Sequence, residues 1–114
     1  LGQCGSESLG PLPYSGTGGQ SDFVRSANRS NGGKAFIVLP STAKDNTISR
    51  IVPTLTPGTH VSTSKNDINY VVTEYGVAQL RGKSAKQRTQ ALIGIAHPDF
   101  RGQLTEAAKK MNLL

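Results

Sequence analysis

Three glycines within four positions give residues 15–23 the character of an anion-binding loop. The stretch reads Ser-Gly-Thr-Gly-Gly-Gln-Ser-Asp-Phe, with Gly16, Gly18 and Gly19 ahead of helix-compatible sequence. Glycine allows positive φ and brings no Cβ, so consecutive backbone N–H groups can converge on one negatively charged atom. The loop is therefore a candidate phosphate or oxyanion site, and an ordinary glycine turn before a helix is the alternative. It is not a dinucleotide fingerprint, because the last glycine of G-x-G-x-x-G falls on Ser21.

Glu74 and His97 are the other side chains whose types and positions suggest chemistry. Glu74 follows an apolar run and comes before Gly76, at the carboxyl end of an expected strand, where sites in α/β proteins form. It could be a nucleophile or a base, but we favour a structural role in which it accepts backbone N–H bonds or pairs with Arg81. For His97, which comes before Pro98, we favour a helix-end role over that of a catalytic base.

The composition argues against two other kinds of site. His60, His97 and Cys4 lie far apart and lack neighbouring ligands, so no metal site is predicted. The 13 Lys and Arg against 7 Asp and Glu give a formal charge of +6, which suits an anionic partner or a solvated basic face. The chain has few aromatic residues with which to stack bases, which disfavours nucleic acid. The closest basic cluster consists of Arg81, Lys83, Lys86 and Arg88.

Three segments have helical patterns. Residues 22–30 place Phe23, Val24 and Ala27 on one face, with Ser21 or Asp22 as the cap and Gly32 after the end. Ser84 can cap a helix over residues 85–96, and Pro98 suits the first turn of a helix that reaches about residue 112. The expected buried face of this last helix consists of Phe100, Leu104, Ala107, Ala108 and Met111.

Strand-like runs alternate with these helices. Residues 35–39 are continuously apolar and predict a central strand buried on both faces, and residues 70–74 predict a second buried strand of the same sheet. Weaker patterns predict a half-exposed strand at 47–52 and a short one at 60–63. The remaining segments are a frayed strand or loop at 1–14, a polar turn at 41–46 and a hinge at 76–80. We therefore predict one α/β domain over residues 1–114, with a mixed or parallel sheet between helices in three layers.

Six motifs become specific in combination. They are GTGGQSDF from Gly16, SNGGK ending at Lys34, LPSTA from Leu39, YVVTEYGVA around Glu74, LRGKS around Arg81, and AHPDFR from Ala96. Together they closely resemble the C-terminal domain of the acetyl-CoA hydrolase/transferase family, which includes acetate and 4-hydroxybutyrate CoA-transferases. The similarity covers essentially the whole chain and implies a CoA-transferase-like α/β fold.

The resemblance implies transfer of CoA between an acyl-CoA and a short-chain carboxylate through a glutamyl-CoA thioester. The family's nucleophilic glutamate lies before the segment seen here, so neither Glu74 nor Glu7 inherits that role. The chain would then be the C-terminal part of a larger cytoplasmic enzyme, working with its own N-terminal domain and inactive alone. Hydrolysis of acyl-CoA remains an alternative, as does a non-catalytic basic module, and a homo-oligomer is left open.

The resemblance also assigns expected site residues. In the family, backbone N–H groups of the glycine loop help to stabilise the thioester oxyanion, and Gly18 or Gly19 are the matching positions. The expected CoA-binding residues are Gly16, Thr17, Gly18, Gly19, Gln20 and Lys34. Arg81 or Lys83 could also meet CoA phosphates, although a solvated role is favoured for each basic side chain.

Overall fold

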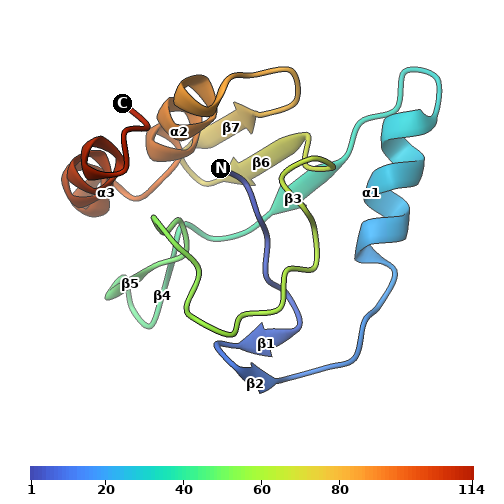
Figure 1. Ribbon diagram of the computed structural model, residues 1–114, viewed down its shortest axis with the longest axis horizontal. Coiled ribbons are helices and arrows are strands. Elements are labelled where there is room, and N and C mark those ends of the chain that lie inside the picture. The colour runs from blue at the N-terminus through green and yellow to red at the C-terminus, as the bar shows by residue number, and fades with distance from the viewer.

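A mixed three-stranded sheet forms the centre of the molecule. The computed structural model describes all 114 residues, Leu1–Leu114. The strands are β3 (Phe36–Val38), β6 (Tyr70–Thr73) and β7 (Gly76–Gln79), in the order β3-β6-β7. β3 runs parallel to β6, and β7 runs antiparallel to β6 (Figure 1). The expectation that residues 35–39 and 70–74 contribute strands to one sheet is therefore confirmed.

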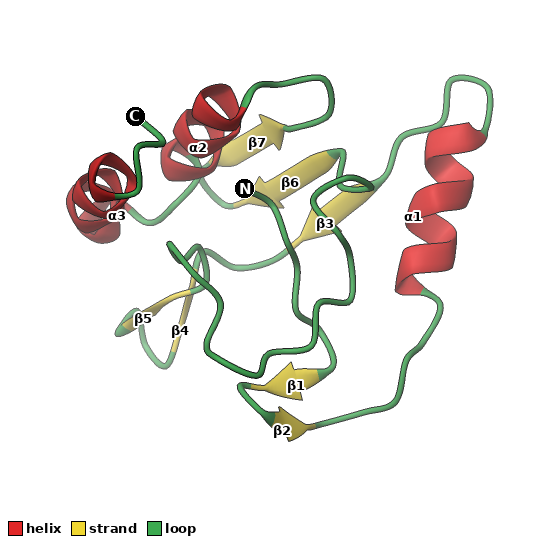
Figure 2. Cartoon of the chain, in the orientation of Figure 1, coloured by secondary structure: helices red, strands yellow, loops and turns green.

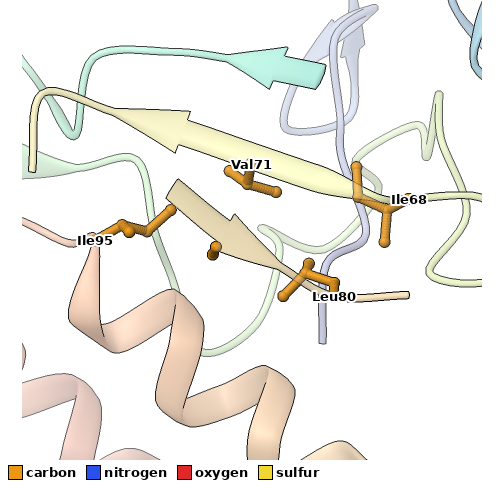
Figure 3. Packing of buried hydrophobic residues seen from close by; sticks show 5 residues of the cluster. Ile68, Val71, Leu80 and Ile95 are labelled. Carbon is orange, nitrogen blue, oxygen red and sulfur yellow. The ribbon is translucent and has the colours of Figure 1, made fainter. Parts of the chain in front are cut away.

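The hydrophobic core lies on one face of this sheet. Helix α2 (Ala85–Gly94) packs against β7 and against α3 (Pro98–Lys110). The buried cluster brings Val71 and Leu80 from the sheet against Ile95 at the end of α2 (Figure 3). Burying side chains of this size stabilises the fold by about 1.5–3 kcal/mol each, so this cluster holds α2 on the sheet. Its full membership is Ile68, Val71, Ala78, Leu80 and Ile95.

The helix boundaries agree closely with the sequence pattern at α2 and α3. Ser84 caps α2, and a capping box with Gln87 completes its first turn. Pro98 occupies the first turn of α3, where its missing N–H has no partner to lose. Leu104 and Ala108 are buried as expected, but Met111 is exposed.

Two predictions about the sheet were wrong. β3 is an edge strand rather than a central one, and Phe36 and Val38 are exposed on one face. An apolar run alone does not show which strands lie beside it, so edge and centre could not be told apart. The expected hinge at residues 76–80 is strand β7, which joins β6 through the two-residue turn Glu74-Tyr75. Gly76 takes φ +137 at the start of this strand, a conformation that favours glycine.

The connection between β3 and β6 also differs from expectation. It is mostly loop (Figure 2) and includes a hairpin of β4 (Thr42–Ala43) and β5 (Ile48–Ser49). The expected polar turn at 41–46 thus contains a strand, while the expected strand at 47–52 has only two strand residues. No strand forms at residues 60–63, where Thr63 makes a single bridge to Cys4.

Helix α1 (Gln20–Arg29) stands beside residues 62–69. Val24 is buried, but Phe23 is 78% exposed, so the expected apolar face was placed wrongly. Neither Ser21 nor Asp22 caps this helix. Its N-cap residue is Gly19, and no side chain accepts a hydrogen bond from the N–H groups of the first turn. Gly32 takes φ +69 just after the helix, as its position there suggested.

The first 14 residues form more structure than the frayed segment we expected. β1 (Ser8–Leu9) and β2 (Leu12–Pro13) make a small antiparallel hairpin. Ahead of it, the Cys4 N–H donates to Thr63 O at 3.0 Å, and the Cys4 carbonyl accepts from the N–H of Ser62 and Thr63. The chain contains no helix of sufficient length and apolarity to cross a membrane.

Candidate functional site

The glycine loop connects β2 to the first turn of α1, at the lower end of that helix in Figure 1. The first N–H groups of a helix have no partner within it, and the helix dipole makes that end favourable for negative charge. No backbone N–H from Gly16 to Asp22 donates a hydrogen bond within the chain, and Gly19 provides no side-chain cap. The loop therefore presents several free donors at the positive end of a ten-residue helix.

The loop glycines do not adopt the left-handed conformation that we expected. Gly16, Gly18 and Gly19 are absent from the residues with positive φ, and Gly19 has φ −86 and ψ 4. A Cβ at Gly19 would lie 3.0 Å from the Phe23 ring, so a side chain there requires a small shift of that exposed ring. A Cβ at Gly16 or Gly18 would meet nothing within 4 Å. Neither conformation nor packing within the chain requires those two glycines.

Glu7 holds the beginning of the loop in place. Its carbonyl accepts hydrogen bonds from the N–H of Tyr14 at 2.8 Å and of Ser15 at 3.2 Å. Its carboxylate accepts from the Thr17 hydroxyl at 3.3 Å. The sequence reasoning did not place Glu7 at the site, although it is the only acidic residue before Asp22. Glu7 thus fixes the path of the backbone into the glycines.

Two side chains of the first turn of α1 hold the other end of the loop. The Gln20 amide donates to the Thr63 hydroxyl at 2.7 Å, and the Ser21 hydroxyl donates to the Ser62 carbonyl. Thr63 is 1% exposed, so these bonds anchor α1 to the interior. The side-chain NH2 of Gln20 is therefore occupied within the chain, whereas its backbone N–H donates no hydrogen bond there.

The basic residues do not converge on the loop. Lys34 is exposed and follows the far end of α1, a helix of ten residues and therefore about 15 Å long at 1.5 Å per residue. Arg81 and Lys83 are exposed in the connection between β7 and α2. Arg88 donates from its guanidinium to the carbonyls of Leu1 and Lys65, at 3.1 and 2.7 Å, so it fastens two backbone segments together. Backbone donors, rather than a cluster of cations, therefore make the loop a candidate site.

Glu74 has the structural role that we favoured from the sequence. Its carboxylate accepts from the Ser41 hydroxyl at 2.6 Å and from the Ser41 N–H at 2.8 Å. The hydroxyl bond is the main cause that lowers the pKa of Glu74 below its ordinary value of 4.5. No ion pair joins Glu74 to Arg81. Glu74 thus fastens the end of β6 to the segment that leaves β3.

His97 caps α3, again as favoured from the sequence. Its Nδ1 accepts from the Asp99 N–H at 3.3 Å, and its ring meets the Tyr75 ring edge-on at 5.4 Å between centroids. The Arg101 guanidinium lies over the Tyr75 ring, 5.6 Å from its centroid, and donates to the Ala96 carbonyl. These contacts join the β6–β7 turn to the start of α3.

An apolar cavity of the chain does not coincide with the loop. It has a volume of about 460 Å³ and lies between the sheet and the 50–55 segment, with Ile37, Val71 and Leu92 among its apolar lining residues. None of residues 16–19 lines it. No group of three or more His, Cys, Asp or Glu side chains is arranged to hold a metal ion.

Comparison with known proteins identifies the family. Residues 1–108 match the model of the acetyl-CoA hydrolase/transferase C-terminal domain. Succinyl-CoA:cyclohexane-1-carboxylate CoA transferase of Geobacter metallireducens is 70% identical over 112 residues, which is 98% of this chain and 26% of that protein. The 4-hydroxybutyrate coenzyme A transferase of Clostridium kluyveri is 56% identical over 110 residues, 96% of this chain and 26% of that protein.

A solved structure agrees with this assignment. The crystal structure of RipA from Yersinia pestis superposes with a TM-score of 0.91 at 48% identity, covering 99% of this chain and 25% of that one. The chain therefore belongs to the acetyl-CoA hydrolase/transferase family and corresponds to the C-terminal domain of that family. The chain spans about a quarter of the length of the relatives it matches.

Proposed function

We propose that this chain is the C-terminal domain of an enzyme that moves CoA between an acyl-CoA and a short-chain carboxylate. A glutamyl-CoA thioester is the intermediate, and the nucleophilic glutamate lies outside residues 1–114. The N-terminal domain of the same polypeptide supplies that glutamate, and the reaction takes place in the cytoplasm. The names of the relatives specify CoA transfer to or from carboxylates, and we propose that this enzyme handles acyl groups of the same class.

The free N–H groups of the glycine loop carry the proposal. Attack on a thioester or acyl carbonyl moves negative charge onto the carbonyl oxygen, and donors already in position stabilise that charge without reorganising. Loss of one such donor typically costs about 3 kcal/mol of transition-state stabilisation. The N–H groups of Gly18 and Gly19 are the proposed oxyanion donors, since they lie beside the first turn of α1 and have no partner in the chain.

The same loop is the proposed contact for CoA. Gly16 and Gly18 face open space, so the backbone there can approach a ligand closely. Thr17 and the Gln20 N–H extend this surface, while Lys34, at the far end of α1, reaches only a distal part of a molecule as long as CoA. No metal takes part in the proposed reaction, because the donors supply the stabilisation of charge.

Acyl-CoA hydrolysis is the second candidate, since the family includes both activities. The full-length enzyme, incubated with an acyl-CoA and an isotopically labelled carboxylate, distinguishes them. We expect the label in a new acyl-CoA and little free CoA. Release of free CoA at a rate independent of the carboxylate would favour hydrolysis, and no consumption of acyl-CoA would contradict both.

A further inference from the structure

Helix α1, which begins at the glycine loop, is held to the rest of the chain mainly by polar contacts. Val24 is its only buried residue. Toward its far end, the Asn28 side-chain amide donates to the Asp67 carbonyl at 2.6 Å, and Arg25 pairs with the Asp67 carboxylate at 3.0 Å. Apolar burial is non-directional, so the direction in which the first N–H groups of α1 point depends on its hydrogen bonds.

At the loop end, Ser62 and Thr63 hold this helix. The Thr63 hydroxyl accepts from the Gln20 side-chain amide at 2.7 Å, and the Ser62 carbonyl accepts from the Ser21 hydroxyl. Gln20 and Ser21 directly follow Gly19, so these bonds lie next to the proposed oxyanion donors. Thr63 is 1% exposed, so bulk water does not compete for the bond to Gln20.

The same two residues also hold the beginning of the segment that contains the loop. The Cys4 N–H donates to the Thr63 carbonyl at 3.0 Å, and the Thr63 N–H donates to the Cys4 carbonyl at 3.1 Å. The Ser6 N–H donates to the Ser62 hydroxyl at 2.9 Å. Residues 4–21 therefore leave from and return to one place in the fold. A change of the Thr63 side chain leaves its backbone bonds to Cys4 intact and removes only the bond to Gln20.

We infer that Thr63 is a positioning residue for the oxyanion donors of the glycine loop. Its hydroxyl fixes Gln20, and Gln20 fixes the first turn of α1 and with it the N–H groups of Gly18 and Gly19. This inference rests on the proposed function, because the aim of these donors matters only if the loop acts in catalysis. Donors stabilise a developing oxyanion only when they point at the position that the oxygen will occupy. A displacement of about 1 Å can lower a rate on the order of a hundredfold.

Thr63→Val and Thr63→Ser in the full-length enzyme test this role. Valine resembles threonine in shape but offers the Gln20 amide no oxygen, whereas serine keeps the hydroxyl. We expect Thr63→Val to lower kcat per folded enzyme on the order of tenfold with little change in KM for the acyl-CoA, because the donors act in the transition state. Thr63→Ser should keep most of the turnover. A normal kcat in Thr63→Val, or an equal loss in both variants, would overturn the inference.

Asn28→Ala is the matched control, because it removes a side-chain hydrogen bond from the far end of the same helix. We expect it to lower the thermal midpoint, as Thr63→Val does, and to leave kcat unchanged. A fall in kcat equal to that of Thr63→Val would show that any loosening of α1 slows the enzyme. That result would overturn the specific role of Thr63.

Gly18→Ala separates failure of this inference from failure of the proposed function. If Gly18→Ala loses turnover and Thr63→Val does not, only the role of Thr63 is overturned. If Gly18→Ala keeps normal turnover, the proposed oxyanion role of the loop is overturned, and this inference falls with it. If both variants lose turnover, the double variant should lose less than the product of the two single losses, because both changes disturb the same donors. Fully multiplicative losses would show that the two residues act independently and would overturn the inference.

Discussion

At the residue scale, substitution of Gly18 can distinguish a role in the site from a role in folding. Its φ is not positive and a Cβ there meets nothing within 4 Å, so alanine fits the chain without strain. We expect Gly18→Ala to leave the thermal midpoint of the full-length enzyme nearly unchanged. Its turnover should fall on the order of a hundredfold, because the methyl group intrudes where the proposed reaction places the carbonyl against the N–H donors.

Gly102→Ala is the matched control for this change. Gly102 lies within α3, and a Cβ there also meets nothing within 4 Å. Alanine in a helix interior is more favourable than glycine by about 1 kcal/mol, so this variant should be slightly more stable and fully active. If Gly18→Ala keeps normal turnover per folded enzyme, the loop does not act in catalysis.

Glu74 links stability to pH through its bonds from Ser41. Because its pKa in the folded protein lies below 4.5, the stability it contributes is fully present above that pH. That contribution is lost as the pH falls through the lowered pKa of the folded state. We expect Glu74→Gln to be less stable than the parent at neutral pH, and the difference to disappear at an acid pH below that lowered pKa.

Urea unfolding at the two pH values measures this difference. Glu106→Gln is the control, because the Glu106 carboxylate contacts only Lys109 on the exposed surface of α3. Exposed pairs of this kind contribute little, so the control should match the parent at neutral pH. A Glu74→Gln variant with the same deficit at both pH values would show that the carboxylate charge does not matter.

At the element scale, the capping box of α2 is a local feature with a measurable contribution. The Ser84 hydroxyl accepts from the Gln87 N–H at 3.3 Å, and the Gln87 side chain accepts from the Ser84 N–H at 2.9 Å. We expect Ser84→Ala to lower the free energy of unfolding by about 1 kcal/mol, since the Gln87 N–H loses its partner. Ser26→Ala, on the exposed side of α1, should change it by less than about 0.5 kcal/mol. Equal effects in urea unfolding would contradict this role for the box.

Local signals of this kind explain what the sequence could predict. Ser84 and Pro98 mark helix starts by their own chemistry, and β-branched runs mark β3 and β6, so these elements were found. β7 was missed because its four residues make sense as a strand only when β6 lies beside them. The edge position of β3 and the exposure of Phe23 likewise depend on neighbours distant in sequence.

The candidate site was predictable to a similar extent. The loop and its position before α1 follow from the glycines, but the reason for each glycine does not. A Cβ at Gly19 would lie close to the Phe23 ring, a proximity that depends on the turn the helix makes. The support from Glu7 and Thr63 comes from residues 10 or more positions away, for which no periodic signal exists.

At the scale of the whole molecule, the acidic residues explain why the domain needs a partner for the proposed reaction. The chain has three glutamates, Glu7, Glu74 and Glu106, and each carboxylate accepts a hydrogen bond from a neighbour in the fold. Glu74 is held by Ser41 and Glu106 by Lys109, both away from the loop. Glu7 touches the loop only through Thr17, where it supports the backbone. None is presented as a free nucleophile beside the N–H donors.

Mapping the covalent intermediate of the full-length enzyme tests whether the nucleophilic carboxylate lies outside this chain. A glutamyl thioester formed with acyl-CoA and without an acceptor carboxylate reacts with hydroxylamine, which releases CoA and leaves a hydroxamate on the nucleophile. We expect the modified residue to lie outside residues 1–114, because in the proposed arrangement the loop supplies donors and the remainder of the polypeptide supplies the carboxylate. Glu74→Gln and Glu7→Gln should therefore still form the adduct, with Glu7→Gln slower because the loop loses part of its support. A hydroxamate at Glu7 or Glu74 would place the nucleophile within this chain and would contradict the proposed arrangement.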